Sequence, residues 1–209
     1  MCKSKAGVLG WVAFTIAHVI ACIILLVVAI KFVPFGHYGI NYDRATGILY
    51  EPVVGTGRYL VGVSHSFITF PSLIQRIEYT DGELGWYTGD SIARQIQVRT
   101  TDGVAVIFYI NFEYQLIQSE LYALIQRFGS QYQNTMVEIA TDLMTDVGSN
   151  FTSIDFYQRR TVVRQAMSDA IAVMLREMGS VLSFFMFGEV ELPRQLESVL
   201  EDVRIVLVW

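Results

Sequence analysis

Histidine and carboxylate side chains are the groups in this chain whose chemistry would suit catalysis or metal binding. The three histidines, His18, His37 and His65, lie far apart in the sequence, and no two of them have the spacing of a zinc site. Residues 64–66 place a serine on each side of a histidine, but nothing in the sequence orients that histidine as a catalytic triad would. We therefore expect a protein that is not an enzyme, with no catalytic, cofactor-binding or metal-binding residues.

Three acidic residues recur at intervals of four, and they form the densest carboxylate pattern in the sequence. Glu138, Asp142 and Asp146 would share one face of a helix. Clustered carboxylates are able to bind Ca²⁺ or to act as acids and bases, but no turn-forming loop or histidine accompanies them. The pattern favours a solvated acidic face.

Charge and cysteine usage narrow the classes of partner. The formal net charge is −5, which argues against a nucleic-acid partner because such proteins normally carry a basic face. Both cysteines, Cys2 and Cys22, fall in the first 30 residues, so the rest of the chain has no disulfide of its own. No motif indicates a small-molecule substrate.

A membrane helix is predicted at the N-terminus. Hydrophobic residues make up 53% of the chain, and residues 7–30 contain no Asp, Glu, Lys or Arg. A helix of that length would be roughly 36 Å long, enough to cross a hydrocarbon core of about 30 Å. A cleavable signal peptide fits less well, because its apolar region typically has about 7–15 residues. We expect a tail over residues 1–6 and a single membrane span over residues 7–32.

The orientation and packing of this span follow from its charges and its small residues. Lys3 and Lys5 precede it, so the positive-inside rule leans towards a soluble domain on the opposite side of the membrane. Small residues along one face would let another helix approach closely, although alanine is common in any span. The small residues on this face are Gly10, Ala13, Ala17 and Ala21.

The remaining chain divides into a strand-rich part and a helix-rich part. Residues 37–79 hold short β-branched and aromatic stretches separated by turn residues. Residues 95–99 and 104–116 predict a hairpin, with the turn at Asp102 and Gly103 and a strict alternation of buried and exposed positions along the second strand.

Helical periodicity then replaces the alternation. We expect a short helix capped by Ser119 and ending at Gly129, a helix over about 131–147, and a long helix over 155–178. A last strand follows over 181–192. Strands first and helices afterwards predict an α+β fold.

These segments together resemble a known family. Val-Pro-Phe-Gly-His-Tyr-Gly at 33–39, Arg-Thr-Thr-Asp-Gly-Val at 99–104, Phe-Tyr-Gln-Arg-Arg at 156–160 and Phe-Gly-Glu-Val-Glu-Leu-Pro at 187–193 occur in this order. The order and spacing resemble the stomatin/prohibitin/flotillin family, also called the SPFH or band 7 domain, in a protist-like eukaryotic branch. The resemblance covers residues 33–200 as one domain, followed by a tail over residues 201–209.

The resemblance implies a membrane-anchored scaffold that organises membrane proteins or lipid by lateral assembly, as a homo- or hetero-oligomer. The alternative that it leaves open is an accessory subunit of a larger membrane complex, such as a respiratory assembly, with the SPFH domain as a docking module. The expected location is the mitochondrial inner membrane with the domain on the intermembrane-space side, and the plasma membrane or an endomembrane are alternatives.

The C-terminal segment departs from the family pattern. Family members usually continue into a long coiled coil, but residues 194–209 sustain no heptad repeat. Either the sequence is part of a longer protein, or this member does not build the usual cage.

Opposite charges near the end of the chain suggest contacts between protomers or with a partner. Basic residues on the long helix would face acidic residues further along, unless both sets are ordinary surface charge. The residues of these two sets are Arg159, Arg160 and Arg164, and Glu189, Glu191, Glu197 and Glu201.

Overall fold

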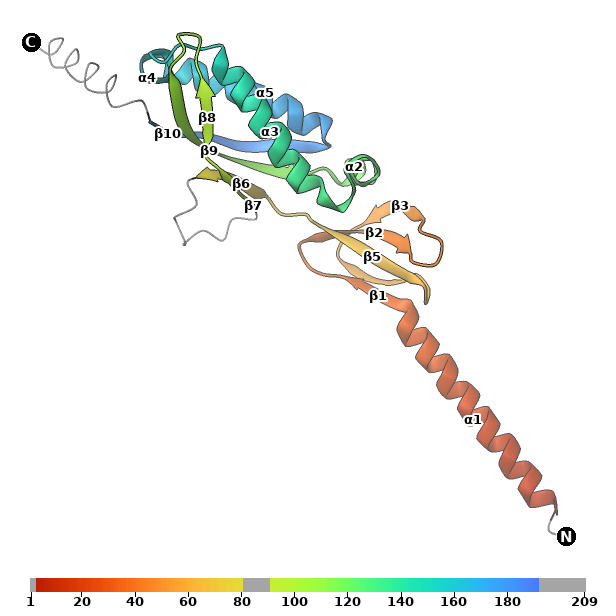
Figure 1. Ribbon diagram of the computed structural model, residues 1–209. Coiled ribbons are helices and arrows are strands. Elements are labelled where there is room, and N and C mark those ends of the chain that lie inside the picture. The colour runs from red at the N-terminus through yellow and green to blue at the C-terminus, as the bar shows by residue number, and fades with distance from the viewer. Residues whose placement is uncertain (1–2, 81–90, 192–209) are drawn as a thin grey trace, which may run out of the picture. The chain divides into compact units, whose positions relative to one another are not determined.

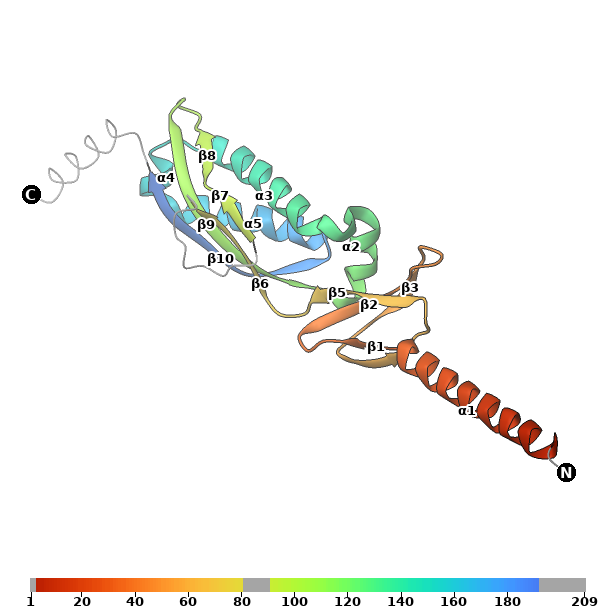
Figure 2. The same ribbon diagram turned by 60° about the horizontal axis from the view of Figure 1, so that its bottom comes forward.

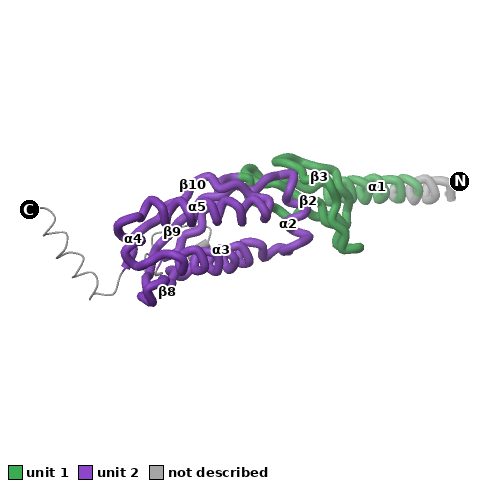
Figure 3. Tube along the Cα trace, turned by 90° about the horizontal axis from the view of Figure 1, so that it is seen from above, with its two compact units in different colours: residues 1–72 green, residues 73–209 purple. Residues whose placement is uncertain are grey.

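The computed structural model describes residues 3–80 and 91–191. It divides into two compact units, Met1–Ser72 and Leu73–Trp209, shown in different colours in Figure 3. The sequence predicts one domain after the N-terminal helix. In the structure, the strands that precede Leu73 and the later sheet with its helices form separate compact units, each with buried apolar residues of its own. The extent of the single domain stays a prediction.

The first unit begins with the helix α1, Lys3–Ala29. The sequence predicts a membrane span over residues 7–32, whereas no helix within the described residues combines the length and hydropathy that a membrane span requires. The helix ends earlier than predicted, because Ile30–Val33 form the strand β1 and pair with a second strand.

Two small antiparallel sheets make up the rest of this unit. Their strands are β1 (Ile30–Val33) with β4 (Gly57–Leu60), and β2 (His37–Asp43) between β3 (Leu49–Val54) and β5 (His65–Pro71). Val33, Ile40 and Phe70 are buried and form the apolar centre of the unit. The short strands predicted within residues 37–71 are confirmed, and β1 is an addition.

The second unit is built on a mixed sheet (Figure 1). Its strands are β6 (Gln75–Thr80), β7 (Ser91–Arg94), β8 (Ile96–Arg99), β9 (Ala105–Leu116) and β10 (Ser180–Glu191). Along the sheet the order is β10-β9-β6-β7, and β8 pairs with the first part of β9. Among the described strands of this sheet, only the β6–β7 pair is parallel.

Strand β9 confirms the predicted hairpin and its alternation. Gly103 has φ +79° in the turn, a conformation that favours glycine. Phe108, Phe112 and their alternate neighbours are fully buried, while Tyr109 and Asn111 point to the other face. One face of β9 therefore belongs to the core, and the other is open to partners or solvent.

Helices cover the buried face of this sheet, as Figures 1 and 2 show. They are α2 (Leu121–Phe128), α3 (Tyr132–Ser149), α4 (Asp155–Gln158) and α5 (Arg160–Glu177), with 3-10 turns η1 (Gln118–Glu120) and η2 (Gly129–Gln131). Tyr79 of β6 ties the layers together, because its hydroxyl donates to the carbonyl oxygen of Val137 in α3 at 2.9 Å. Burial raises the pKa of Tyr79 to about 12, so this hydroxyl stays a donor.

Two helix boundaries differ from the prediction. Ser119 is not an N-cap, because it lies inside the 3-10 turn that precedes α2. The long helix predicted over 155–178 is broken at Arg159, whose backbone angles of φ −113° and ψ 36° are not helical. The predicted stop at Gly179 is confirmed, since this residue has φ +68° and follows Met178, the C-cap of α5.

Candidate membrane-facing and docking surfaces

Over residues 14–28, the surface of helix α1 is predominantly apolar. Its large hydrophobic side chains are exposed, and residues 23–28, which extend over more than one full turn, are all apolar or aliphatic. Exposed large residues in the helix are Trp11, Val12, Phe14, Ile16, Val19, Ile20, Ile23, Ile24, Leu25, Leu26, Val27 and Val28. A helix that is hydrophobic all round is typical of a buried or lipid-contacting segment.

The few polar side chains in the middle of α1 bond to its own backbone. The Thr15 hydroxyl donates to the carbonyl oxygen of Val12 at 2.9 Å, and His18 Nδ1 lies 3.2 Å from the carbonyl oxygen of Phe14. Such intrahelical bonds satisfy polar groups where no water is at hand.

The apolar surface continues past the end of the helix. The carbonyl oxygen of Ala29 accepts hydrogen bonds from the backbone amides of Val61 and Gly62, so the last turn of α1 is tied to the end of β4. In the β1–β4 pair Ile30 lies opposite Leu60, and directly opposed side chains of an antiparallel pair share a face. Phe32 lies two residues along on that same face.

We call Ile30, Phe32 and Leu60 the ribbon face. Phe32 is 69% exposed and Leu60 68% exposed, values that are unusual for such side chains in a folded unit. Phe35, in the turn that follows β1, is 87% exposed. Lys31 and Arg58 are the cations of the same two strands, so aromatic, aliphatic and basic side chains occur together here.

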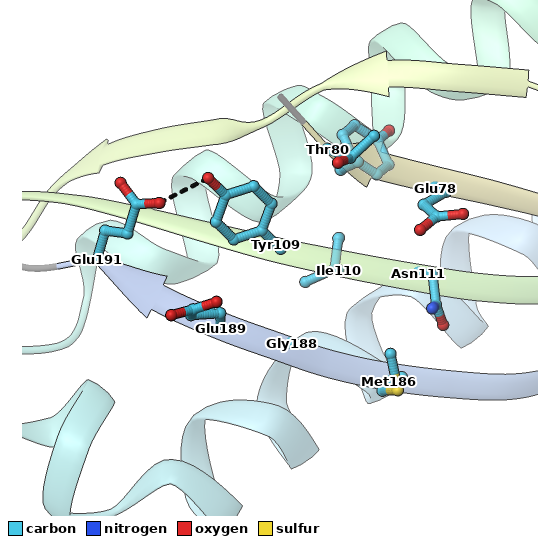
Figure 4. Close-up of a pocket in the computed structure, with 10 residues that line it drawn as sticks. Glu78, Thr80, Tyr109, Ile110, Asn111, Met186, Gly188, Glu189 and Glu191 are labelled. Carbon is cyan, nitrogen blue, oxygen red and sulfur yellow. Dashed lines mark hydrogen bonds between the residues drawn. The ribbon is translucent and has the colours of Figure 1, made fainter. Parts of the chain in front are cut away.

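The second unit has a pocket of about 360 Å³ on the face of the sheet opposite its helices (Figure 4). Most of its lining side chains alternate with the buried ones on β6, β9 and β10, which places them on the open face. Glu78, Asn111 and Tyr109 line it from β6 and β9, while Met186 and Glu189 line it from β10.

The pocket carries negative charge that is only partly compensated. The Tyr109 hydroxyl donates to Glu191 Oε1 at 2.7 Å. Glu78 Oε2 is buried and has no hydrogen-bond partner within the described residues. The neighbouring Glu113 is neutralised by Arg76, whose Nε donates to Glu113 Oε1 at 3.0 Å.

Comparison with known proteins decides the family. The family model of the SPFH domain / Band 7 family matches residues 29–206, which is most of the chain. The chain belongs to the SPFH/band 7 family. No curated protein matches it. Proteins of this family are generally membrane-associated scaffolds, and the resemblance found in the sequence is thereby confirmed at the level of the family.

The predicted packing face of the N-terminal helix lies in α1 of this SPFH chain. Ala17 and Ala21 are exposed there, one turn apart, as a helix partner would require. The side-chain surroundings of Gly10 and Ala13 lie outside the described part of the structure. The face remains a prediction.

The three predicted arginines have different surroundings. Arg159 is paired with Asp155, since its Nε donates to Asp155 Oδ1 at 2.7 Å. Arg160 donates to the carbonyl oxygens of Phe187 and Gly188 in β10 and lies over the Phe187 ring, 5.2 Å from its centroid. Arg164 is exposed on α5. Two of the three therefore already contribute to the fold of their own chain.

The acidic partners predicted for these arginines are only partly described. Glu189 and Glu191 are exposed at the end of β10 and line the pocket. Glu197 and Glu201 lie outside the described residues, as does the tail predicted over 201–209. Pairing between these two charged sets in neighbouring protomers remains a prediction.

The candidate catalytic groups are not brought together. His18 lies in α1, His37 begins β2 and His65 begins β5, where its Nδ1 lies 3.0 Å from Asn41 Oδ1. Over residues 3–80 and 91–191, no three His, Cys, Asp or Glu side chains are grouped to hold a metal ion. Glu138, Asp142 and Asp146 are exposed on α3, which agrees with the predicted acidic face.

Sequence reasoning missed both the ribbon face and the pocket. The ribbon face requires β1, which the sequence predicts as the end of the helix, to pair with β4, about 27 residues later. The pocket requires the register of three strands, of which β10 follows β9 only after all the helices. The signal that was available is the apolar Phe-Val-Pro-Phe at 32–35, too hydrophobic for an ordinary turn.

Proposed function

We propose that this SPFH chain is a non-enzymatic membrane scaffold that organises neighbouring membrane proteins or lipid by lateral assembly. The observation that carries the proposal is the set of exposed apolar side chains in the first unit, which occur on α1, on the ribbon face and at Phe35. Membership of the SPFH/band 7 family supports it independently.

Exposure of large apolar side chains to water costs free energy. A Leu, Ile or Phe side chain left in water loses about 1.5–3 kcal/mol relative to full burial. Many such side chains are exposed on α1 and on the ribbon face, far more than the scattered few that a soluble surface tolerates. A bilayer would bury these side chains without any change in the fold of the unit.

We propose that the two parts of this surface, α1 and the ribbon face, lie at different depths in the membrane. The charge-free run over residues 7–30 supports insertion of α1 into the hydrocarbon core, and Thr15 and His18 need no water there. The ribbon face, with Phe32 and the opposed Arg58, suits the interfacial layer, where aromatic and basic side chains are enriched.

Lateral assembly is the second part of the proposal. Ala17 and Ala21 offer a close approach to another helix, and Arg164, Glu189 and Glu191 are charged groups on the exterior of the second unit. These contacts would hold protomers or partners side by side, and the first unit would fix them to the membrane.

Native gel electrophoresis in mild detergent, followed by native mass spectrometry, tests the assembly. A scaffold gives a ladder or a large homo-oligomer of this chain. A single heteromeric band with stoichiometric partners would contradict the scaffold and indicate an accessory subunit of a larger membrane complex.

We also propose the mitochondrial inner membrane as the location, with the SPFH domain on the intermembrane-space side. Lys3 and Lys5 ahead of the charge-free run support this orientation through the positive-inside rule. Protease added to mitoplasts should then digest the domain. Digestion only after the inner membrane is lysed, or recovery of the chain in another membrane fraction, would refute this part.

A further inference from the structure

We propose that the open face of the second unit's sheet docks a peptide segment of a partner protein, with a Lys or Arg side chain in the pocket and apolar residues beside it. The inference names the kind of partner that the proposed scaffold would hold, and it rests on that function. The pocket shares Glu189 and Glu191 with the proposed assembly contacts, and peptide binding is measured separately from assembly and from membrane attachment.

Charge is the first reason for a basic partner. Three carboxylates, those of Glu78, Glu189 and Glu191, line one pocket. Arg76, the nearest cation on this face of β6, is committed to Glu113. Arg160 approaches β10 but donates to the carbonyl oxygens of Phe187 and Gly188. Arg94 of β7 lies opposite the pocket-lining Thr80, but within the described residues no ion pair joins it to these carboxylates, so their charge is left for a partner.

The surroundings of Glu78 point the same way. Its Oε2 is buried and has no hydrogen-bond partner within the described residues, a state that costs free energy unless a donor arrives. In Figure 4 the Glu78 carboxylate lies on the same side of the sheet as Tyr109 and Asn111. An ammonium or guanidinium group entering there would supply donors to a carboxylate that now lacks one.

The shape of the pocket suits a long side chain. Gly188 brings β10 close to β9, because a Cβ on it would lie only 2.9 Å from the carbonyl oxygen of Tyr109. The volume of about 360 Å³ is at the lower end of the roughly 300–1,000 Å³ found for ligand sites. The methylene stem of Lys or Arg would pack on Met186 and Tyr109.

An apolar row on β10 indicates which residue types the partner should carry next to its basic residue. Val181, Phe184 and Met186 are 54%, 51% and 44% exposed on the open face, and they lead along the strand towards the pocket. At about 3.3 Å per residue, Phe184 is roughly 13 Å from Gly188, which an extended peptide covers in about four residues. The partner should therefore carry an apolar or aromatic residue within about four positions of its basic residue.

A peptide-display selection on the full chain in nanodiscs tests this. A library of random 12-residue peptides is panned on the chain, and the enriched peptides are measured by fluorescence anisotropy. We expect a Lys or Arg near an apolar residue, and at least tenfold weaker binding to the pocket variant Glu78→Gln/Glu189→Gln/Glu191→Gln. Phe184→Ser should also weaken binding.

A matched control removes the same charge elsewhere. Glu138→Gln/Asp142→Asn/Asp146→Asn neutralises three exposed carboxylates on α3 and should leave peptide affinity within about twofold of the unmodified chain. Circular dichroism verifies that all variants fold.

Several results would overturn the proposal. They are a selection that enriches no basic-apolar motif, equal binding to the pocket variant, or equal losses in the pocket and control variants. A pocket variant that changes only the homo-oligomer mass would mean that a second copy occupies the face, and competition by Ca²⁺ alone would mean a cation site. Failure of membrane attachment would refute the scaffold, and peptide binding would then be measured on the full chain in solution.

Discussion

The carboxylate of Asp102 and the hydroxyl of Ser153 are 2.6 Å apart, although 51 residues separate them in the sequence. The backbone amide of Ser153 donates to the same carboxylate at 3.1 Å, and the Thr100 hydroxyl also donates to it. These bonds join the β8–β9 turn to the loop between α3 and α4. The turn motif of this family member therefore also serves as a tertiary contact.

The stability that this contact contributes should depend on pH. Burial raises the pKa of Asp102, but the hydrogen bonds from Ser153 and Thr100 outweigh it and leave the pKa below its ordinary value. A pKa that is lower in the folded state contributes stability above the unfolded pKa, about 3.9, and this contribution is lost as the pH falls through the folded pKa. Asp102→Asn should therefore reduce the free energy of unfolding by about 1 kcal/mol at pH 7.

Urea unfolding of the full chain at pH 7 and at pH 3 measures this difference. The gap between Asp102→Asn and the unmodified chain should shrink at pH 3. A gap that is constant with pH would show that the carboxylate charge plays no part. Asp142→Asn, on the exposed face of α3, is the control and should behave as the unmodified chain does at both pH values.

The turn itself offers a second prediction. Gly103 has φ +79° and open space around its Cβ position, so a substitution there is strained by the backbone alone. Gly103→Val should destabilise by about 1–2 kcal/mol, and Gly103→Asn by less, because asparagine tolerates this conformation better. Thermal unfolding of the full chain measures both.

Gly55→Val is the control for the turn. Its Cβ position also meets nothing within 4 Å, and its φ is not in the left-handed range. If Gly103→Val and Gly55→Val lower the melting temperature equally, the positive φ is not the cause of the loss.

This hairpin shows what the sequence alone is able to predict. Alternation along β9, the Asp-Gly turn and the glycine stop after α5 are local signals, and all three are confirmed. The break at Arg159 is not local, because it accompanies the docking of Arg160 on β10, 27 residues away along the chain. The helical periodicity of the sequence continues through Arg159, so the sequence predicts a single helix.

The candidate surfaces were harder to predict for the same reason. The sequence predicts Glu189 and Glu191 as contacts to a protomer or partner. Glu78 lies near them only because β6 and β10 both pair with β9. Likewise, Leu60 joins Ile30 and Phe32 only through the β1–β4 register. The composition indicates that apolar residues are numerous, whereas strand pairing determines which of them lie together on one surface.

The arginines of α5 give a third prediction. Arg160→Gln removes hydrogen bonds to two carbonyl oxygens of β10 and a contact with the Phe187 ring, so it should destabilise the chain by about 1 kcal/mol. Arg164→Gln should change stability by less than about 0.5 kcal/mol, because its side chain is exposed. Any loss of oligomer in Arg164→Gln would then report a contact between chains. Equal destabilisation by both substitutions would contradict this division of roles.

A fourth prediction concerns helix packing in α1. Ala17→Ile puts a large side chain at the centre of the small-residue face without reducing hydrophobicity, so it should weaken co-purification of partners or protomers and leave membrane attachment intact. Ile20→Ala, which shortens a large exposed side chain of the same helix, is the control. Normal association of the Ala17→Ile variant would contradict a role for the small-residue face in helix packing.

Attachment to the membrane through α1 is the central claim, and alkaline carbonate extraction tests it most directly. Membranes from cells that express the full chain are washed at high pH, and the chain is followed by immunoblot in the pellet and in the supernatant. The chain should remain in the pellet, and a variant with Ile16→Lys, Ile20→Lys and Ile24→Lys should move to the supernatant, because each lysine at the centre of a span costs about 2.5–3.5 kcal/mol. Release of the unmodified chain into the supernatant would contradict the account.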